Sequence, residues 1–308
     1  MQPGNPQKII IICGPTGIGK TSTAIQLSQE FSGEIISADS MQIYREMDIG
    51  TAKPTQTDQE LVPHHMINVV HPDEPFDAAT FIKKADSVIR SLIQRNRLPF
   101  IVGGTGLYIK ALIHGLFRTR PADKEVMSRF RNKSDQFGSE TLHKQLKECD
   151  PQAAARIHPN DAFRIIRALE IFEATGKPIS TYHDLHRFSE KKYHALKIGL
   201  SCEREALYAL INQRVDIMLD QGLLGEVEQL LNKGYPADLK SMQSLGYRHM
   251  TAYLTGKITW DEAVNTMKRD TRRYAKRQMT WFKADPEIKW YAKDRIEEIR
   301  KEIRSFLL

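Results

Sequence analysis

The chain has 308 residues, 41% of them hydrophobic, and a formal net charge of +7 at pH 7. This composition supports a well-packed core and excludes collagen-like and disordered chains. No apolar run approaches the roughly 20 residues that span a bilayer, and residues 1–7 lack the basic and apolar regions of a secretory signal. The three cysteines are too far apart for a metal pattern and form no even disulfide framework. We therefore expect a cytoplasmic protein that does not insert into membranes.

The first predicted element is a buried strand that leads into a phosphate-binding loop. Residues 8–13 form a β-branched apolar run typical of a buried parallel strand, and helical spacing follows over residues 21–29. The loop between them matches G-x-x-x-x-G-K-[ST] at every fixed position. Its backbone N–H groups would surround a phosphate, with the lysine on the terminal phosphates and the last hydroxyl on Mg²⁺. The predicted phosphate-binding residues are Gly14, Pro15, Thr16, Gly17, Ile18, Gly19, Lys20 and Thr21, with Thr21 as the metal ligand.

Strands alternate with helices elsewhere in the chain. Strands are predicted for residues 33–39, 64–70, 98–104 and 194–200, and a helix capped by Asp77 is predicted for residues 78–96. This alternation predicts a parallel sheet flanked by helices, an α/β fold of the P-loop NTPase type. His64 and His65 are not expected to bind one metal, because adjacent side chains of a strand point to opposite faces.

A helical insertion interrupts this pattern. Between residues 121 and 192 the strand signal disappears, and short amphipathic helices are predicted for residues 124–136, 140–149, 151–158 and 162–174. We therefore predict a P-loop core whose first part is residues 1–120, an all-helical insertion domain of residues 121–192, and a core completion of residues 193–308. The last part is predicted to be mostly helical from residue 203 onward.

Polar residues follow the predicted strands at the edge where open parallel sheets bind ligands. Asp39 ends the second strand and should face the same crevice as the phosphates. It could be a Mg²⁺ ligand, a general base or only a turn residue. Gln42 carries amide donors and an acceptor suited to the edge of a base. Thr105 offers a hydroxyl in a glycine-rich turn.

Basic residues are concentrated between residues 268 and 277. On a helix, most of them share one broad face. A phosphate-binding surface is the functional interpretation, and a solvated helix face is the alternative. The residues on this face are Arg269, Arg272, Arg273, Lys276 and Arg277.

Several segments, in order, resemble the bacterial tRNA dimethylallyltransferase family. Besides the phosphate loop they are residues 39–45, 50–54, 64–67, 103–108, 156–161, 243–248 and 271–278, so the resemblance covers nearly the whole chain. It implies a prenyltransferase that moves a dimethylallyl group from dimethylallyl diphosphate to N6 of the adenosine 3′-adjacent to the anticodon of tRNA. The phosphate loop and Mg²⁺ would then hold the diphosphate of this donor.

The resemblance also implies roles for single residues. Asp39 would be the general base, and Thr105 and Arg214 would complete the catalytic set. In the insertion, Arg164 and Arg167 would form a cationic face, with Phe163 and Ile166 facing inward. Met127 departs from the family, in which an arginine is common there. The implied partner is the anticodon stem-loop, bound by a monomer through Asp39, Ser40, Met41, Gln42, Thr105, Met127, Phe163, Arg164, Ile165, Ile166, Arg167 and Arg248.

Three other functions fit parts of the sequence. A small-molecule kinase would use the phosphate loop for ATP, but no arginine-rich lid segment is evident. An adenylate isopentenyltransferase would prenylate AMP or ADP, whereas the insertion and the basic segment favour a polynucleotide acceptor. A non-enzymatic RNA-binding protein would leave Lys20, Thr21 and Asp39 unexplained.

Overall fold

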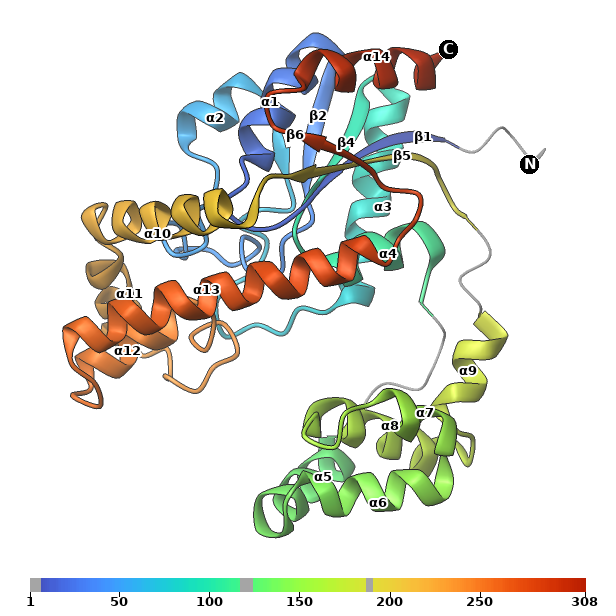
Figure 1. The fold of residues 1–308 in the computed structure, drawn as a ribbon, viewed down its shortest axis with the longest axis vertical. Coiled ribbons are helices and arrows are strands. Elements are labelled where there is room, and N and C mark those ends of the chain that lie inside the picture. The colour runs from blue at the N-terminus through green and yellow to red at the C-terminus, as the bar shows by residue number, and fades with distance from the viewer. Residues whose placement is uncertain (1–6, 117–123, 187–190) are drawn as a thin grey trace. The chain divides into compact units, whose positions relative to one another are not determined.

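The computed structural model describes residues 7–116, 124–186 and 191–308 (Figure 1). The chain divides into two compact units. We call Met1–Ile113 together with Lys191–Leu308 the core unit, and His114–Glu190 the insertion unit. Within the core unit the backbone N–H of Lys192 donates to the carbonyl of Ile113 at 2.8 Å. The two points at which the chain leaves and re-enters the core unit therefore lie side by side.

A six-stranded sheet in the order β3-β2-β4-β1-β5-β6 forms the centre of the core unit. Every neighbouring pair is parallel, which confirms the predicted parallel sheet. Because β1 and β2 both pair with β4, the carboxyl ends of these three strands lie next to one another. The strands are β1 (Lys8–Cys13), β2 (Gly33–Ser37), β3 (His64–His65), β4 (Leu98–Gly103), β5 (His194–Ser201) and β6 (Lys289–Ala292).

Helices cover both faces of the sheet (Figure 1). Side chains alternate along β1, so Ile9 and Ile11 enter one hydrophobic cluster and Ile10 and Ile12 enter the other. The first cluster includes α3 (Ala78–Gln94) and α4 (Gly106–His114), and the second includes α1 (Lys20–Glu30) and α14 (Ile296–Leu307). Asp77 caps α3 through a hydrogen bond from Thr80 N, as predicted.

Four further helices follow β5 and complete the core unit. They are α10 (Arg204–Asp220), α11 (Leu223–Asn232), α12 (Tyr247–Leu254) and the long α13 (Trp260–Lys283), while the short α2 (Gln56–Leu61) lies between β2 and β3. α13 packs against both α10 and α12 (Figure 1). Within the described residues, no helix is long and apolar enough to cross a membrane.

One strand prediction was wrong, and one strand was not predicted. The predicted strand at residues 64–70 is only His64–His65, because Met66 and Asn68 adopt φ values of 63° and 53°, outside the extended region. The edge strand Lys289–Ala292 was missed, since four residues are too few for a recognisable alternation. His65 pairs with Glu34 at 2.7 Å, whereas His64 contacts the carbonyl of Val62.

The insertion unit has a hydrophobic core of its own. Its helices are α5 (Lys124–Phe137), α6 (Ser139–Cys149), α7 (Pro151–Arg156), α8 (Ala162–Thr175) and α9 (Ile179–His186). The last was not predicted; it begins directly after Pro178, and proline is favoured at the start of a helix. The buried Asp150 caps α7 through Ala153 N and accepts a bond from Ser180 N in α9.

Candidate functional site

The phosphate loop connects β1 to the N-terminus of α1, in the strand–loop–helix order that the sequence predicts. Gly17 and Gly19 have φ values of 84° and 96°, a backbone conformation that glycine adopts without strain. A side chain on Gly14 would meet the Leu200 carbonyl at 2.7 Å. The loop can therefore hold its N–H groups around an anion at the positive end of α1.

A cavity of about 340 Å³ lies over this loop, and we call it the phosphate-loop cavity. Lys20 and Thr21 line it together with Asp39 and the turn after β4. The Lys20 ammonium donates to the Pro15 carbonyl at 2.7 Å. Its burial, together with the neighbouring Arg214 guanidinium, lowers the pKa of Lys20 to about 8. The cavity thus combines backbone donors with a cation that is close to its titration point at neutral pH.

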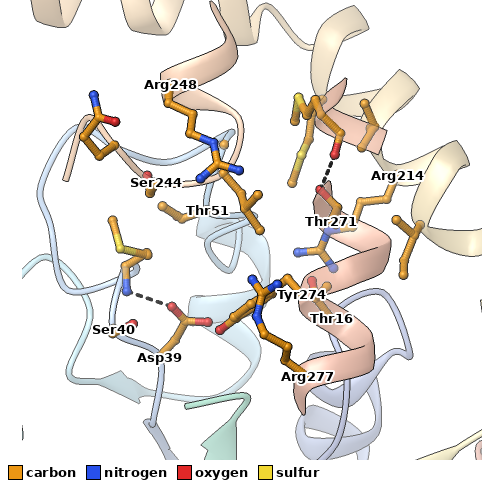
Figure 2. Close-up of a pocket in the computed structure, with 18 residues that line it drawn as sticks. Thr16, Asp39, Ser40, Thr51, Arg214, Ser244, Arg248, Thr271, Tyr274 and Arg277 are labelled. Carbon is orange, nitrogen blue, oxygen red and sulfur yellow. Dashed lines mark hydrogen bonds between the residues drawn. The ribbon is translucent and has the colours of Figure 1, made fainter. Parts of the chain in front are cut away.

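A second cavity of about 290 Å³ adjoins the first, and we call it the adjacent cavity (Figure 2). Its walls come from the segment after β2, the loop around residue 50, residues 243–248, and helices α10 and α13. The two cavities share part of their walls. The residues that line both are Thr16, Asp39, Thr51, Arg214 and Tyr274.

Asp39 lies at this junction, and its two carboxylate oxygens differ in their surroundings. Oδ1 accepts bonds from the backbone N–H groups of Met41 and Gln42 at 2.8 and 3.3 Å, so Asp39 does form a turn. Oδ2 has no hydrogen-bond partner among the described residues. Tyr274 points toward the carboxylate (Figure 2), and burial followed by the Asp39 charge raises the pKa of this tyrosine. One oxygen is thus left for a ligand.

Arg214, predicted as a catalytic residue, brings a half-buried cation to the same junction. Burial lowers the pKa of its guanidinium, and the Asp39 charge raises it. Among the described residues it makes no ion pair at salt-bridge distance. Lys20 and Arg214 therefore give the junction two cations for the single carboxylate of Asp39, an arrangement that favours an anionic ligand.

Gln278 is a residue of this site to which the sequence analysis gave no role. Its buried side chain extends from α13, accepts a bond from Thr16 N at 2.8 Å and donates to the Gly104 carbonyl at 3.0 Å. A Cβ on Gly104 would meet Gln278 Nε2 at 2.1 Å, so the glycine is needed for this approach. Gln278 joins α13 to the phosphate loop and to the turn after β4.

Thr105 and Gln42, which were predicted to contact the substrates, bond within the chain, and Gln42 also lines the phosphate-loop cavity. The Thr105 hydroxyl accepts a bond from Ser40 N at 3.0 Å, and Thr105 lines neither cavity. The Gln42 amide accepts from Ser37 Oγ and donates to the carbonyls of Thr51 and Ala52. The amide that was predicted to face a base is thus engaged within the chain. Ser40 and Met41 line the adjacent cavity.

The insertion unit corrects one prediction. Phe163 is 66% exposed instead of facing inward, whereas Ile165 and Ile166 are buried. The inward face of α8 follows residues 162, 165, 166 and 169, and position 163 lies outside this stripe. Met127 and Phe163 line the same small cavity, of about 160 Å³. Arg164 pairs with Asp161 and Arg167 pairs with Glu170, each one turn away.

The basic residues of α13 do not all face solvent. Arg273, Lys276 and Arg277 are exposed, and Arg277 also lines the adjacent cavity, whereas the half-buried Arg272 donates to Asn212 on α10 at 2.6 Å. Arg248, predicted to bind tRNA, also lines that cavity and pairs with Asp270 of α13 at 2.7 Å. α13 therefore presents positive charge both on the surface and inside the site.

Comparison with known proteins identifies the family. The sequence profile of the family described as IPP transferase matches residues 42–285, and the profile described as isopentenyl transferase matches residues 7–68. The tRNA dimethylallyltransferase of Desulfosudis oleivorans is 54% identical over 301 residues, which cover 97% of this chain and 96% of the relative. That of Desulfatibacillum aliphaticivorans is also 54% identical over 301 residues, covering 98% of both chains.

Solved structures agree with the sequences. The full-length tRNA isopentenylpyrophosphate transferase of Bacillus halodurans superimposes with a TM-score of 0.73 at 42% identity, over 98% of this chain and 97% of that one. A eukaryotic dimethylallyltransferase acting on tRNA gives 0.79 at 30% identity, over 93% and 74%. These neighbours confirm the predicted P-loop NTPase-like fold. The chain therefore belongs to the tRNA dimethylallyltransferase family of enzymes.

Proposed function

We propose that this enzyme transfers a dimethylallyl group from dimethylallyl diphosphate to N6 of the adenosine 3′-adjacent to the anticodon in tRNA. The observation that carries the proposal is the junction of the two cavities, where Asp39 and Arg214 line both. A transferase must bring a donor and an acceptor into contact, and these cavities adjoin at a carboxylate with one unpaired oxygen.

The donor diphosphate would occupy the phosphate-loop cavity, with the loop N–H groups, Lys20 and Arg214 on its oxygens. As the bond between the dimethylallyl carbon and the diphosphate oxygen breaks, negative charge grows on the leaving group. Cations and N–H groups already in place stabilise that charge in the transition state more than in the ground state.

The acceptor adenine would enter the adjacent cavity with its N6 toward Asp39. An exocyclic amine becomes acidic only as its bond to carbon forms, so the proton leaves N6 for Asp39 Oδ2 as the C–N bond forms and diphosphate departs. The Met41 and Gln42 N–H groups hold Oδ1 and so fix the direction of Oδ2. The adenine must be out of its stack to reach this depth.

The residues present fit Mg²⁺. This ion binds through one or two protein oxygens together with substrate phosphates, and Thr21 supplies a hydroxyl to the phosphate-loop cavity. The described part of the chain holds no cluster of three or more His, Cys, Asp or Glu residues that would suit a different metal. Thr21 would hold the ion, whose charge would further neutralise the diphosphate.

The surfaces proposed for the tRNA are the exposed cations of α13, Arg248, and α8 with its exposed Phe163. An exposed aromatic ring beside cationic residues suits an RNA loop, because bases stack on rings and phosphates attract positive charge. These surfaces are what a tRNA acceptor needs and what AMP would not use.

A transfer assay tests the proposal. Purified enzyme, Mg²⁺ and labelled dimethylallyl diphosphate are incubated with unmodified tRNA, with AMP, or with the same tRNA carrying guanosine in place of the target adenosine. We expect label on the first acceptor alone. Label on AMP would assign the chain to mononucleotide prenylation, and label on the guanosine tRNA would refute the target atom. Formation of ADP from ATP in a parallel reaction would favour a kinase.

A further inference from the structure

The segment of residues 48–53, which we call the partition loop, forms a wall of both cavities. Gly50 and Thr51 line the adjacent cavity, whereas Thr51, Ala52 and Lys53 line the phosphate-loop cavity. The loop belongs to no helix or strand, so the sheet and helix ladders do not fix its backbone. Something else must hold it, because a wall that moves would not keep two reactants aligned.

Glu226, on α11, holds the first half of this loop. Its Oε2 accepts the backbone N–H groups of Asp48 and Ile49 at 2.9 and 2.8 Å, and its Oε1 accepts that of Gly50 at 3.1 Å. The Tyr247 hydroxyl donates to Oε1 at 2.5 Å. Three consecutive backbone donors thus converge on one carboxylate, in the manner of an anion-binding nest.

The charge and shape of this group matter to the arrangement. A carboxylate offers lone pairs on two oxygens and is a strong acceptor, whereas an amide has one oxygen and would direct an NH₂ group at other donors. Tyr247 is fully buried and its ring lies against Gly50, where a Cβ would come within 2.5 Å of the ring. The loop is therefore held by hydrogen bonds on one side and by packing on the other.

The second half of the loop has separate supports. Gln42 Nε2 donates to the carbonyls of Thr51 and Ala52, and Lys53 Nζ donates to the carbonyl of Tyr44 at 2.7 Å. Lys53 also links the two halves, because its Nζ donates to Asp48 Oδ1 at 2.6 Å and its backbone N–H donates to the Asp48 carbonyl at 2.9 Å. Loss of the Glu226 carboxylate should release the backbone N–H groups of residues 48–50, of which Gly50 lines the adjacent cavity. The bonds from Gln42 and Lys53 should still hold the wall of the phosphate-loop cavity.

We propose that Glu226 is a positioning residue for the acceptor: it fixes the partition loop so that the adenine and its ribose meet a rigid wall. This inference rests on the proposed function, because it assigns the adjacent cavity to the acceptor. It predicts that the carboxylate affects use of tRNA and leaves donor binding nearly unchanged.

The test compares Glu226→Gln with Glu228→Gln, a matched control at an exposed position of the same helix. We expect kcat/KM for tRNA to fall by about tenfold or more in the first variant. The Kd for dimethylallyl diphosphate with Mg²⁺, measured by calorimetry without tRNA, should stay within about twofold. Amide hydrogen exchange at residues 48–50 should become faster, with no change at residues 39–42. The control should match the wild-type enzyme throughout.

Two results would overturn the inference. One is wild-type kcat/KM for tRNA despite faster exchange at residues 48–50. The other is an equal loss of donor and tRNA binding, which would make Glu226 a support of the whole fold. If Glu226→Gln does not fold, Gly50→Ala displaces the same loop against the Tyr247 ring. This variant should likewise lower kcat/KM for tRNA and leave the Kd for the donor nearly unchanged. Failure of the proposed function is distinguishable, because the wild-type enzyme would then not modify tRNA at all.

Discussion

At the scale of single residues, the two oxygens of the Asp39 carboxylate have different surroundings. Asp39 uses Oδ1 to hold the backbone of Met41 and Gln42, which leaves Oδ2 for a ligand. If Asp39 is the general base, as proposed, the two N–H groups on Oδ1 give Oδ2 the defined direction that proton transfer in a transition state requires. The same division makes the residue testable without disturbing its turn.

Asp39→Asn retains an oxygen for the turn and removes the basic oxygen. We expect kcat for tRNA modification to fall by about 10²–10⁴-fold, the usual contribution of a general base. The KM for the donor should stay close to the wild-type value, because the loop donors and Lys20 are unchanged. Steady-state kinetics with each substrate varied in turn measure both. A normal single-turnover rate with weakened donor binding would contradict the assignment as base.

Lys20 makes donor use sensitive to pH. Because burial and Arg214 lower its pKa to about 8, the ammonium is charged below this pH and neutral above it in the free enzyme. A diphosphate binds the charged form better, so kcat/KM for the donor should fall as the pH rises through about 8. A bound diphosphate raises the pKa of Lys20, so kcat at saturating donor should not fall as the pH rises through about 8. The pH dependence of kcat is therefore the internal control. A kcat/KM profile flat to about pH 10, the ordinary lysine range, would contradict the prediction.

At the scale of elements, α13 connects the surface to the phosphate loop. Along one helix lie exposed cations, the cavity residues Thr271 and Tyr274, and Gln278, which holds Thr16 and Gly104. A rigid helix with these two faces places the surface proposed for tRNA at a fixed distance from the cavity proposed for the donor. Helix periodicity alone produces these faces, because residues three and four apart share a side.

The exposed cations of α13 should set the salt dependence of tRNA binding. Changing Arg273 and Lys276 to Gln should reduce the slope of log K against log salt by roughly 0.7–0.9 for each lost phosphate contact. Arg272 is left in place because it also holds α10. Lys301→Gln on α14 removes an exposed charge elsewhere in the core unit and controls for net charge. Filter binding at several salt concentrations gives the slopes, and equal slopes for all variants would mean that the α13 surface is only solvated.

At the scale of the whole molecule, the insertion unit is a separate compact unit inserted into the sequence of the core unit. It has its own hydrophobic cluster. In the core unit, the two chain positions that flank it are joined by the hydrogen bond from Lys192 N to the Ile113 carbonyl. The phosphate loop and both cavities are built from core-unit residues alone. Donor binding and recognition of tRNA by the insertion unit should therefore be separable.

Replacing residues 114–190 with a short Gly-Ser linker tests this separation. The adjacent chain ends should let the core unit fold, and dimethylallyl diphosphate with Mg²⁺ should raise its Tm as it does in the intact enzyme. Transfer to tRNA should fall by about 10²-fold or more, because the contacts of α8 are lost. The Tm measured with and without donor checks donor binding, and a tRNA modification assay checks the loss of transfer. Undiminished transfer would show that the insertion unit is not needed for recognition.

The sequence alone was sufficient for the parts of the protein that contiguous residues determine. The phosphate loop, the strand before it, the helix after it, most helix bounds and the helical insertion follow from local patterns of hydrophobicity, glycine and capping residues. The family also follows from the sequence, because its motifs recur in order along the chain. The short β6 was not predicted, because four residues are too few to show an alternation of hydrophobic and polar side chains.

Tertiary structure decided which distant residues meet. Gln278 bonds to Thr16 from 262 residues away, and Glu226 holds Gly50 from 176 residues away. Gln42 is engaged within the chain, and Phe163 faces outward because its neighbours at helical spacing fill the core of the insertion unit. A local pattern indicates which face of an element is apolar, but hydrogen bonds between segments depend on where packing brings those segments together. That physical difference separates what sequence could predict here from what only the folded chain shows.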